Sequence, residues 1–100
     1  MSKLIEEKVP AVCNRLEVDR EDLLNIERDD LARMLFLLHL VREFETTVLD
    51  LHEAGLVHGP AHTSIGQEAI AAATALVLRK TDMMGSTHRA HGHFLAKALL

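Results

Sequence analysis

Between Ser86 and Lys97 the chain reads STHRAHGHFLAK, which places three histidines and one arginine within six residues. Neutral imidazole nitrogens bind Zn, Cu, Fe and Ni, whereas a guanidinium can grip a phosphate at two points. The same residues could also form the solvated face of a helix. The stretch therefore has three possible interpretations: a metal site, an anion site or a wet surface.

The metal interpretation has candidate ligands in His88, His91 and His93, and a further pair in His58 and His62. On a helix, however, positions two apart such as 91 and 93 point to different sides. The chain has no H-E-x-x-H motif and only one cysteine, so multi-thiolate sites are excluded. We therefore expect no metal site, and solvated histidines are the simpler alternative.

The anion interpretation depends on Arg89. This residue stands at the start of a helix predicted over Arg89 to Leu100, where free amides and the helix dipole favour negative charge. His88 and His91 could add donors or titrate near neutral pH. Residues 55–100 hold four Lys/Arg against two Asp/Glu, but they lack the basic clusters and interleaved aromatics of a nucleic-acid surface. The anion interpretation and the solvated surface both stay open on these residues alone, and we expect no nucleic acid.

The elements that must position these side chains are predicted to be helices. The 100 residues are 48% hydrophobic but only 3% aromatic, which favours a mainly α fold. A long helix is expected from Asp30 to Ala54, with Asp29 as its N-cap and Gly55 as its left-handed closing residue. Its apolar residues cover two adjoining faces, which predicts more than one packing neighbour. These residues are Leu31, Met34, Leu37, Leu38, Leu40, Val41, Phe44, Val48 and Leu51.

A second helix is expected from Gln67 to Leu78. Ser64 and Gln67 match the S-x-x-Q capping box, and the alanine-rich body should let neighbours approach closely, which predicts a central helix. The MMG run that follows could form at most one short strand. The last helix should bury one side, and the chain stops within it, so we expect a fragment of a longer protein. The expected buried residues of that helix are Phe94, Leu95, Ala98 and Leu99.

The N-terminal part, residues 1–28, is predicted to be a polar helical extension or linker, with a helix over residues 3–16 and Asp19 capping a short turn. Residues 29–100 form the second part. His39 lies within an apolar run and is expected in the core or at its boundary, whereas His52 is expected to be exposed at a helix end. The lone Cys13, an acidic N-terminus and a most apolar run of only eight residues, Met34 to Val41, predict a reduced, cytoplasmic protein without membrane association.

Two motifs suggest a family. The H-x-x-x-G-Q-E-A pattern from His62 to Ala69, followed about twenty residues later by H-R-A-H-G-H, resembles the N-terminal part of a known alpha-type subunit. That subunit belongs to the thiamine-diphosphate-dependent decarboxylating component of 2-oxo acid dehydrogenase complexes, in the pyruvate and acetoin dehydrogenase branch. The similarity covers about residues 30–98. It implies the helical N-terminal segment of a thiamine-diphosphate-binding α/β fold.

The resemblance also implies roles for four residues. Arg89 and His88 match the positions that contact the cofactor diphosphate, although many members carry tyrosine at the second of these. His62 matches the histidine near the 2-oxo acid, and His91 matches a histidine near the substrate channel, so both are expected on the catalytic side. The implied cofactor is thiamine diphosphate with Mg. The implied partners are a beta-type subunit or domain, a lipoyl acyltransferase that receives the acyl unit, and a 2-oxo acid or acetoin substrate, in a homo- or hetero-oligomer.

The sequence departs from the family pattern in two places. Ala98 stands where the family usually has glycine, and the Gly-Asp-Gly motif that holds the metal and diphosphate is absent from these 100 residues. We therefore expect the chain alone to be inactive and to bind the cofactor weakly. A non-catalytic helical oligomerisation or interaction module is the alternative function, and a small histidine-based metal protein is a third.

Overall fold

The computed structural model describes residues 17–99 and is mainly helical, as predicted. It contains α1 (Arg20–Leu24), α2 (Arg28–Glu53), α3 (Glu68–Val77) and α4 (His91–Ala98), and no strand is found within the described residues. The MMG run lies in an extended, largely exposed segment between α3 and α4. The helix predicted over residues 3–16 lies outside the described part of the chain.

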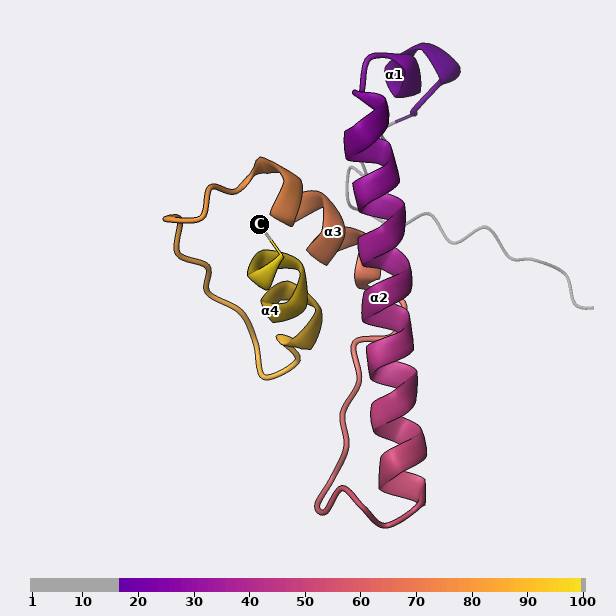
Figure 1. The fold of residues 1–100 in the computed structure, drawn as a ribbon, viewed down its shortest axis with the longest axis vertical. Helices are drawn as coiled ribbons and strands as arrows, with labels where there is room; N and C mark the ends of the chain where they lie inside the picture. The colour runs from indigo at the N-terminus through magenta and orange to yellow at the C-terminus, as the bar shows by residue number, and fades with distance from the viewer. Residues whose placement is uncertain (1–16, 100) are drawn as a thin grey trace, which may run out of the picture.

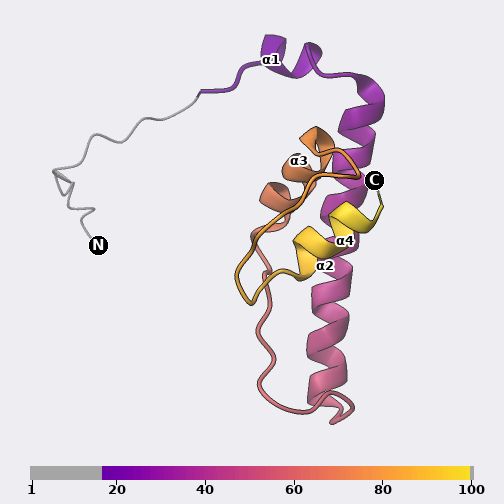
Figure 2. The ribbon, with the colours of Figure 1, turned by 90° about the vertical axis from the view of Figure 1, so that its left-hand side faces the viewer.

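The long helix α2 is the largest element of the described structure, and α3 and α4 pack against it (Figure 1). The helices α3 and α4 lie together beside its N-terminal half and reach just past its middle, and each of these three helices contacts the other two. Figure 2 shows the connection from α2 to α3 returning alongside the other half of α2. This arrangement confirms the prediction that α2 packs against more than one neighbour and that α3 is central.

The core is small and is built from residues with short side chains. Leu37 of α2 is 1% exposed and packs with the alanines of α3 and with Ala96 of α4, and Val41 of α2 is 0% exposed. The remaining buried hydrophobic residues are Ala71, Ala72 and Ala75. Alanine at the helix contacts lets the three backbones approach closely, which compensates in part for the lack of large apolar residues.

The end of α2 follows the prediction, whereas its start does not. Gly55 has φ of +75°, its amide donates to the His52 carbonyl, and the Leu56 amide donates to the Leu51 carbonyl, which is the Schellman motif. At the other end the predicted Asp29 cap is wrong, because the helix begins at Arg28. Asp29 instead lies in the first turn, where its charge favours the helix dipole without capping it.

The short helix α1 is capped as predicted. The Asp19 carboxylate accepts from the Asp22 amide at 3.0 Å, and the Asp22 carboxylate accepts from the Asp19 amide at the same distance. This reciprocal pair satisfies two amides that the first turn would otherwise leave unpaired. The helix α1 contains no buried residue, so its capping and not burial defines it.

The last helix, α4, differs from the prediction in the residue at which it begins and in the residues that it buries. It begins at His91, two residues after Arg89, and its buried residues are Gly92 and Ala96. Phe94 is 73% exposed and Leu99 is 50% exposed, so the predicted buried side is wrong. The small residues face α2 and α3 because only they fit where the backbones are close. A Cβ on Gly92 would lie 3.0 Å from Val41 Cγ1 and 3.3 Å from Ala71 Cβ.

Candidate functional site

The predicted site residues come from the two connections that precede α3 and α4. His62 lies in the connection before α3, and His88 and Arg89 lie in the one before α4. The structure brings the first two together, since the His62 and His88 rings are 5.8 Å apart in an edge-on arrangement. Both histidines are exposed. Residues separated by 26 positions thus form one surface, which the sequence motifs alone did not show.

Arg89 lies at the edge of the same surface. Its side chain is exposed and makes no hydrogen bond within residues 17–99, and its backbone amide donates to Thr87 Oγ1 at 3.3 Å. Arg89, Ser64 and Gln67 line a small hollow between α3 and α4, together with Gly92 and His93. The guanidinium is therefore available to an external anion, although it precedes α4 by two residues and does not stand at the helix start.

His91, the fourth predicted residue, is placed differently. Its Nδ1 lies 3.2 Å from Oε1 and 3.4 Å from Oε2 of Glu45, a carboxylate of α2 that is fully buried. Ser64 Oγ donates to the same Oε1 at 2.6 Å. The Phe44 ring also packs in a T-shaped arrangement with the imidazole, with centroids 5.9 Å apart. His91 is thus bound to the protein interior on one side, while its ring stays 39% exposed.

The contacts of Ser64 show that the predicted capping box is wrong. The Ser64 hydroxyl donates to Glu45, and Gln67 makes no side-chain cap to α3. The carboxylate of Glu68 takes over part of that role, because both its oxygens accept from the Gly66 amide at 3.0 Å. The backbone contact between the Gln67 amide and the Ser64 carbonyl, at 3.0 Å, completes the turn.

Glu68 is also joined to α2. Arg42 Nε donates to Glu68 Oε1, and Glu68 is only 6% exposed. The hydrogen bond from Arg42 lowers the pKa of Glu68 to about 2, with a smaller contribution from the Gly66 amide, against the opposing effect of burial. The same pair raises the pKa of Arg42. Two carboxylates, Glu45 and Glu68, thus connect α2 to the start of α3.

The other histidines have separate environments. His39 is exposed, so its predicted place in the core or at its boundary is wrong, because it points away from the stripe that contains Leu37 and Val41. His52 is exposed as predicted, and its Nε2 lies 2.8 Å from the Gly59 carbonyl. No three His, Cys, Asp or Glu residues come together as possible metal ligands among residues 17–99.

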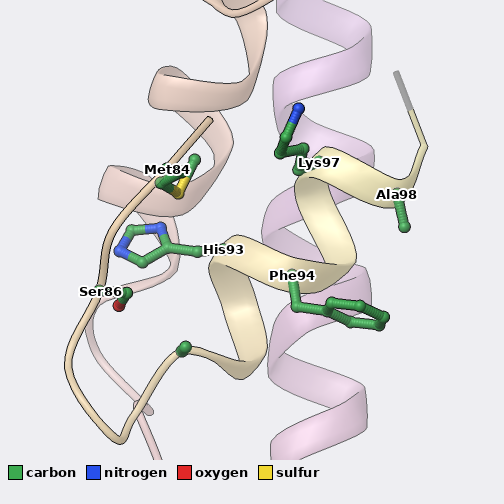
Figure 3. A pocket seen from close by; sticks show the side chains of 7 residues that line it. Met84, Ser86, His93, Phe94, Lys97 and Ala98 are labelled. Carbon is green, nitrogen blue, oxygen red and sulfur yellow. The ribbon is translucent and has the colours of Figure 1, made fainter. Parts of the chain in front are cut away.

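His93 separates the small hollow from a larger open pocket of about 490 Å³. Figure 3 shows its ring pointing from α4 toward the extended segment that carries Met84 and Ser86, whereas Phe94 points away from that segment. His93 Nδ1 is buried and has no hydrogen-bond partner in the described residues. The pocket is mostly apolar at its walls, which are formed by Met84, Ser86, Ala90, His93, Phe94, Lys97 and Ala98.

Comparison with known proteins supports the resemblance carried by the two motifs. The chain is 37% identical over 89 residues to the pyruvate dehydrogenase E1 component subunit alpha of Zymomonas mobilis, covering 88% of this chain and 23% of that protein. It is 37% identical over 70 residues to the corresponding Rhizobium meliloti subunit, covering 70% of this chain and 20% of that protein. The chain is similar to E1 alpha subunits. Acetoin-type relatives appear as well.

The acetoin relative is the alpha subunit of acetoin:2,6-dichlorophenolindophenol oxidoreductase from Bacillus subtilis. It is 40% identical over 57 residues, which cover 57% of this chain and 17% of that protein. The chain therefore spans about a fifth of the length of these alpha-subunit relatives. No protein-family model matches the chain, and no solved structure matches it significantly. The predicted relationship to the pyruvate and acetoin dehydrogenase branch is confirmed.

Two groups of residues at this site were missed by reasoning from the sequence. Glu45 follows Val41 by four positions and Leu37 by eight, so it falls on the buried stripe of α2. A carboxylate in such a stripe needs hydrogen-bond donors. The position of Glu45 in the sequence could therefore have indicated a buried, hydrogen-bonded carboxylate. The Arg42 to Glu68 pair gave no comparable signal, because its partners are 26 residues apart and each resembles an ordinary surface charge.

Proposed function

We propose that this chain is the helical N-terminal segment of the alpha-type subunit of a thiamine-diphosphate-dependent 2-oxo acid or acetoin dehydrogenase. The similarity to E1 alpha and acetoin oxidoreductase alpha subunits is the observation that carries the proposal. The meeting of His62 with His88 at the edge where Arg89 lies supports it, because residues from both motifs share one surface. The two parts of the chain would be the extension over residues 1–28 and the cofactor-domain segment over residues 29–100.

The residues present fit one portion of the cofactor. Arg89 offers an exposed guanidinium fork, and His88 lies beside it, so both suit the diphosphate. Residues 17–99 offer no binding site for the Mg that accompanies the cofactor, since they contain no cluster of three potential metal ligands. When bound in a complete protein, thiamine diphosphate would supply the carbanion chemistry of decarboxylation. His62 and His91 would serve the substrate side, and Mg would be held by residues outside this chain.

The proposal extends to partners and location. A beta-type subunit or domain would complete the site, and a lipoyl acyltransferase would receive the acyl unit within a cytoplasmic oligomer. No helix within residues 17–99 has the length and apolarity needed to cross a bilayer. The chain by itself is proposed to be inactive. One arginine and a few histidines offer too few contacts to replace the water that surrounds the free cofactor.

The test uses thiamine diphosphate and Mg with two proteins: the 100-residue chain, and a longer protein read from the same gene together with a beta-type partner. The chain should show no saturable binding at millimolar cofactor and no turnover of pyruvate or acetoin. In the longer protein, Arg89→Gln should weaken cofactor binding about tenfold or more, because a bidentate charge-assisted contact is lost.

The matched control is Arg79→Gln, which removes the same charge from an arginine that pairs with Asp82 on an exposed turn. It should leave cofactor affinity unchanged. Equal effects of the two substitutions, or turnover by the 100-residue chain, would contradict the proposal. The absence of a Gly-Asp-Gly motif from the longer protein would contradict it as well.

A second candidate function, a non-catalytic interaction module, has its own observation. Leu35 and Phe36 on α2 are 57% and 58% exposed, which leaves large apolar side chains in water. Sedimentation of the chain distinguishes the two candidates when combined with cofactor binding in the longer protein. A discrete oligomer of the chain, with no cofactor affinity in the longer protein, would favour the module.

A further inference from the structure

The group with no role so far is the buried carboxylate of Glu45. It lies in the middle of α2, is 0% exposed, and is among the largest fully buried side chains of the described residues. Removing a carboxylate from water is unfavourable unless donors replace its hydration. The structure supplies two such donors from two other elements, Ser64 Oγ at 2.6 Å and His91 Nδ1 at 3.2 Å.

The contact with Glu45 decides which ring nitrogen of His91 carries hydrogen. A carboxylate is only an acceptor, so an imidazole nitrogen that faces it must be the N–H donor. In the neutral ring the other nitrogen, Nε2, then keeps its lone pair and is an acceptor. Carboxylate partners fix the tautomer and orientation of histidine in this way at metal sites and in catalytic triads.

The surroundings restrict the ring to this orientation. Ser64 Oγ donates to the same Glu45 Oε1 that His91 contacts, so the carboxylate is bound to the connection before α3 as well as to α4. The Phe44 ring packs in a T-shaped arrangement with the imidazole. Gly92, next in sequence, is packed so tightly that even a Cβ would lie 3.0 Å from Val41 Cγ1. The backbone that carries His91 is therefore held in place along with its ring.

We propose that Glu45 is a positioning residue that holds His91 in the Nδ1–H tautomer and leaves Nε2 as the acceptor. Ser64 is the second support of the same carboxylate. In its consequence for catalysis this inference rests on the proposed function. There His91 would accept a hydrogen bond or a proton on the substrate side, whereas donating to the cofactor diphosphate would be left to His88 and Arg89.

The test is an NMR measurement of ring nitrogen and carbon-bound proton correlations in the 100-residue chain labelled with ¹⁵N-histidine, above the pH at which the rings are charged. The wild-type spectrum should show His91 as the Nδ1–H tautomer, distinct from exposed His39 and His58. In Glu45→Met, the ratio of the Nδ1–H to the Nε2–H form should fall about tenfold or more, because a hydrogen bond to a charged group is lost. Methionine is unbranched and suits the helical site.

The control is Ser64→Ala, which removes the other donor to the same carboxylate and should leave His91 in the Nδ1–H form. His93, in the same helix, reports whether α4 is still folded in each variant. The inference is overturned if wild-type His91 resembles His39 and His58, or if folded Glu45→Met keeps the wild-type ratio. Should Glu45→Met unfold, the wild-type tautomer decides by itself. The readout needs no cofactor, so its failure is distinct from failure of the proposed function.

Discussion

The ion pair between Arg42 and Glu68 joins α2 to the first turn of α3. The substitution Glu68→Gln tests how much this pair contributes to the free energy of unfolding. The carboxylate accepts from Arg42 Nε and from the Gly66 amide, and these bonds hold its pKa near 2 instead of its ordinary value of 4.5. Glutamine keeps the shape and one acceptor oxygen but removes the charge. We expect the variant to be less stable than the wild type at pH 7.

The magnitude follows from the pKa of Glu68. A difference of one in pKa between folded and unfolded states corresponds to about 1.36 kcal/mol, which gives about 3.4 kcal/mol for the change from 4.5 to about 2. The Arg42 side chain is 50% exposed, however, so water screens its charge. We therefore expect Glu68→Gln to lower the free energy of unfolding by about 1–2 kcal/mol.

The pH dependence has a definite sign. Because the folded pKa lies below the unfolded one, the contribution is complete above about pH 4.5 and is lost as the pH falls toward 2. Urea unfolding followed by circular dichroism from pH 7 to pH 2 should show this acid loss in the wild type but not in Glu68→Gln. The matched control is Glu43→Gln, an exposed glutamate on α2, which should keep the acid loss. Parallel curves for wild type and Glu68→Gln would refute the reasoning.

Three further substitutions follow from the packing, each measured by urea unfolding. Gly92→Ala should destabilise by about 1–2 kcal/mol, because overpacking against Val41 outweighs the gain in helix propensity, whereas Gly85→Ala, with open space around it, should be neutral. Leu37→Ala should cost about 2–4 kcal/mol by opening a cavity, and the exposed Leu35→Ala on the same helix less than about 1 kcal/mol. Gly55→Ala should cost about 1–2 kcal/mol because φ is +75° there. Equal effects within the Gly92 and Gly85 pair or the Leu37 and Leu35 pair, or a neutral Gly55→Ala, would contradict these assignments.

The helices could be predicted from the sequence because their signals are local. The stripe from Leu31 to Val48 and the closing Gly55 give the extent of α2, and the alanines give the central place of α3. Those features depend on residues within one or two turns of each other. The buried face of α4 could not be predicted in the same way. A hydrophobic pattern gives more weight to large apolar residues such as Phe94 than to Gly92, yet Phe94 is exposed and Gly92 is buried.

The sequence motifs pointed to four candidate residues, but not to the contacts that these residues make. The motifs singled out His62, His88, Arg89 and His91, and the structure brings the first two together. It directs His91 to Glu45, an interaction over 46 positions that no spacing rule describes. Contacts of this kind depend on how α2 and α4 cross, which is a property of the packed helices and not of either segment alone.

Ser64 shows why local rules fail at this site. A capping box would use its hydroxyl to satisfy an exposed first-turn amide of α3, which water could also do at little cost. The hydroxyl instead serves Glu45, whose buried carboxylate has no access to water and would be left with His91 as its only donor in the described residues. The penalty for an unsatisfied buried charge exceeds that for an uncapped, exposed amide. The Ser64 hydroxyl therefore donates to the buried Glu45 carboxylate. The Gly66 amide, next to the start of α3, is satisfied by the Glu68 carboxylate instead.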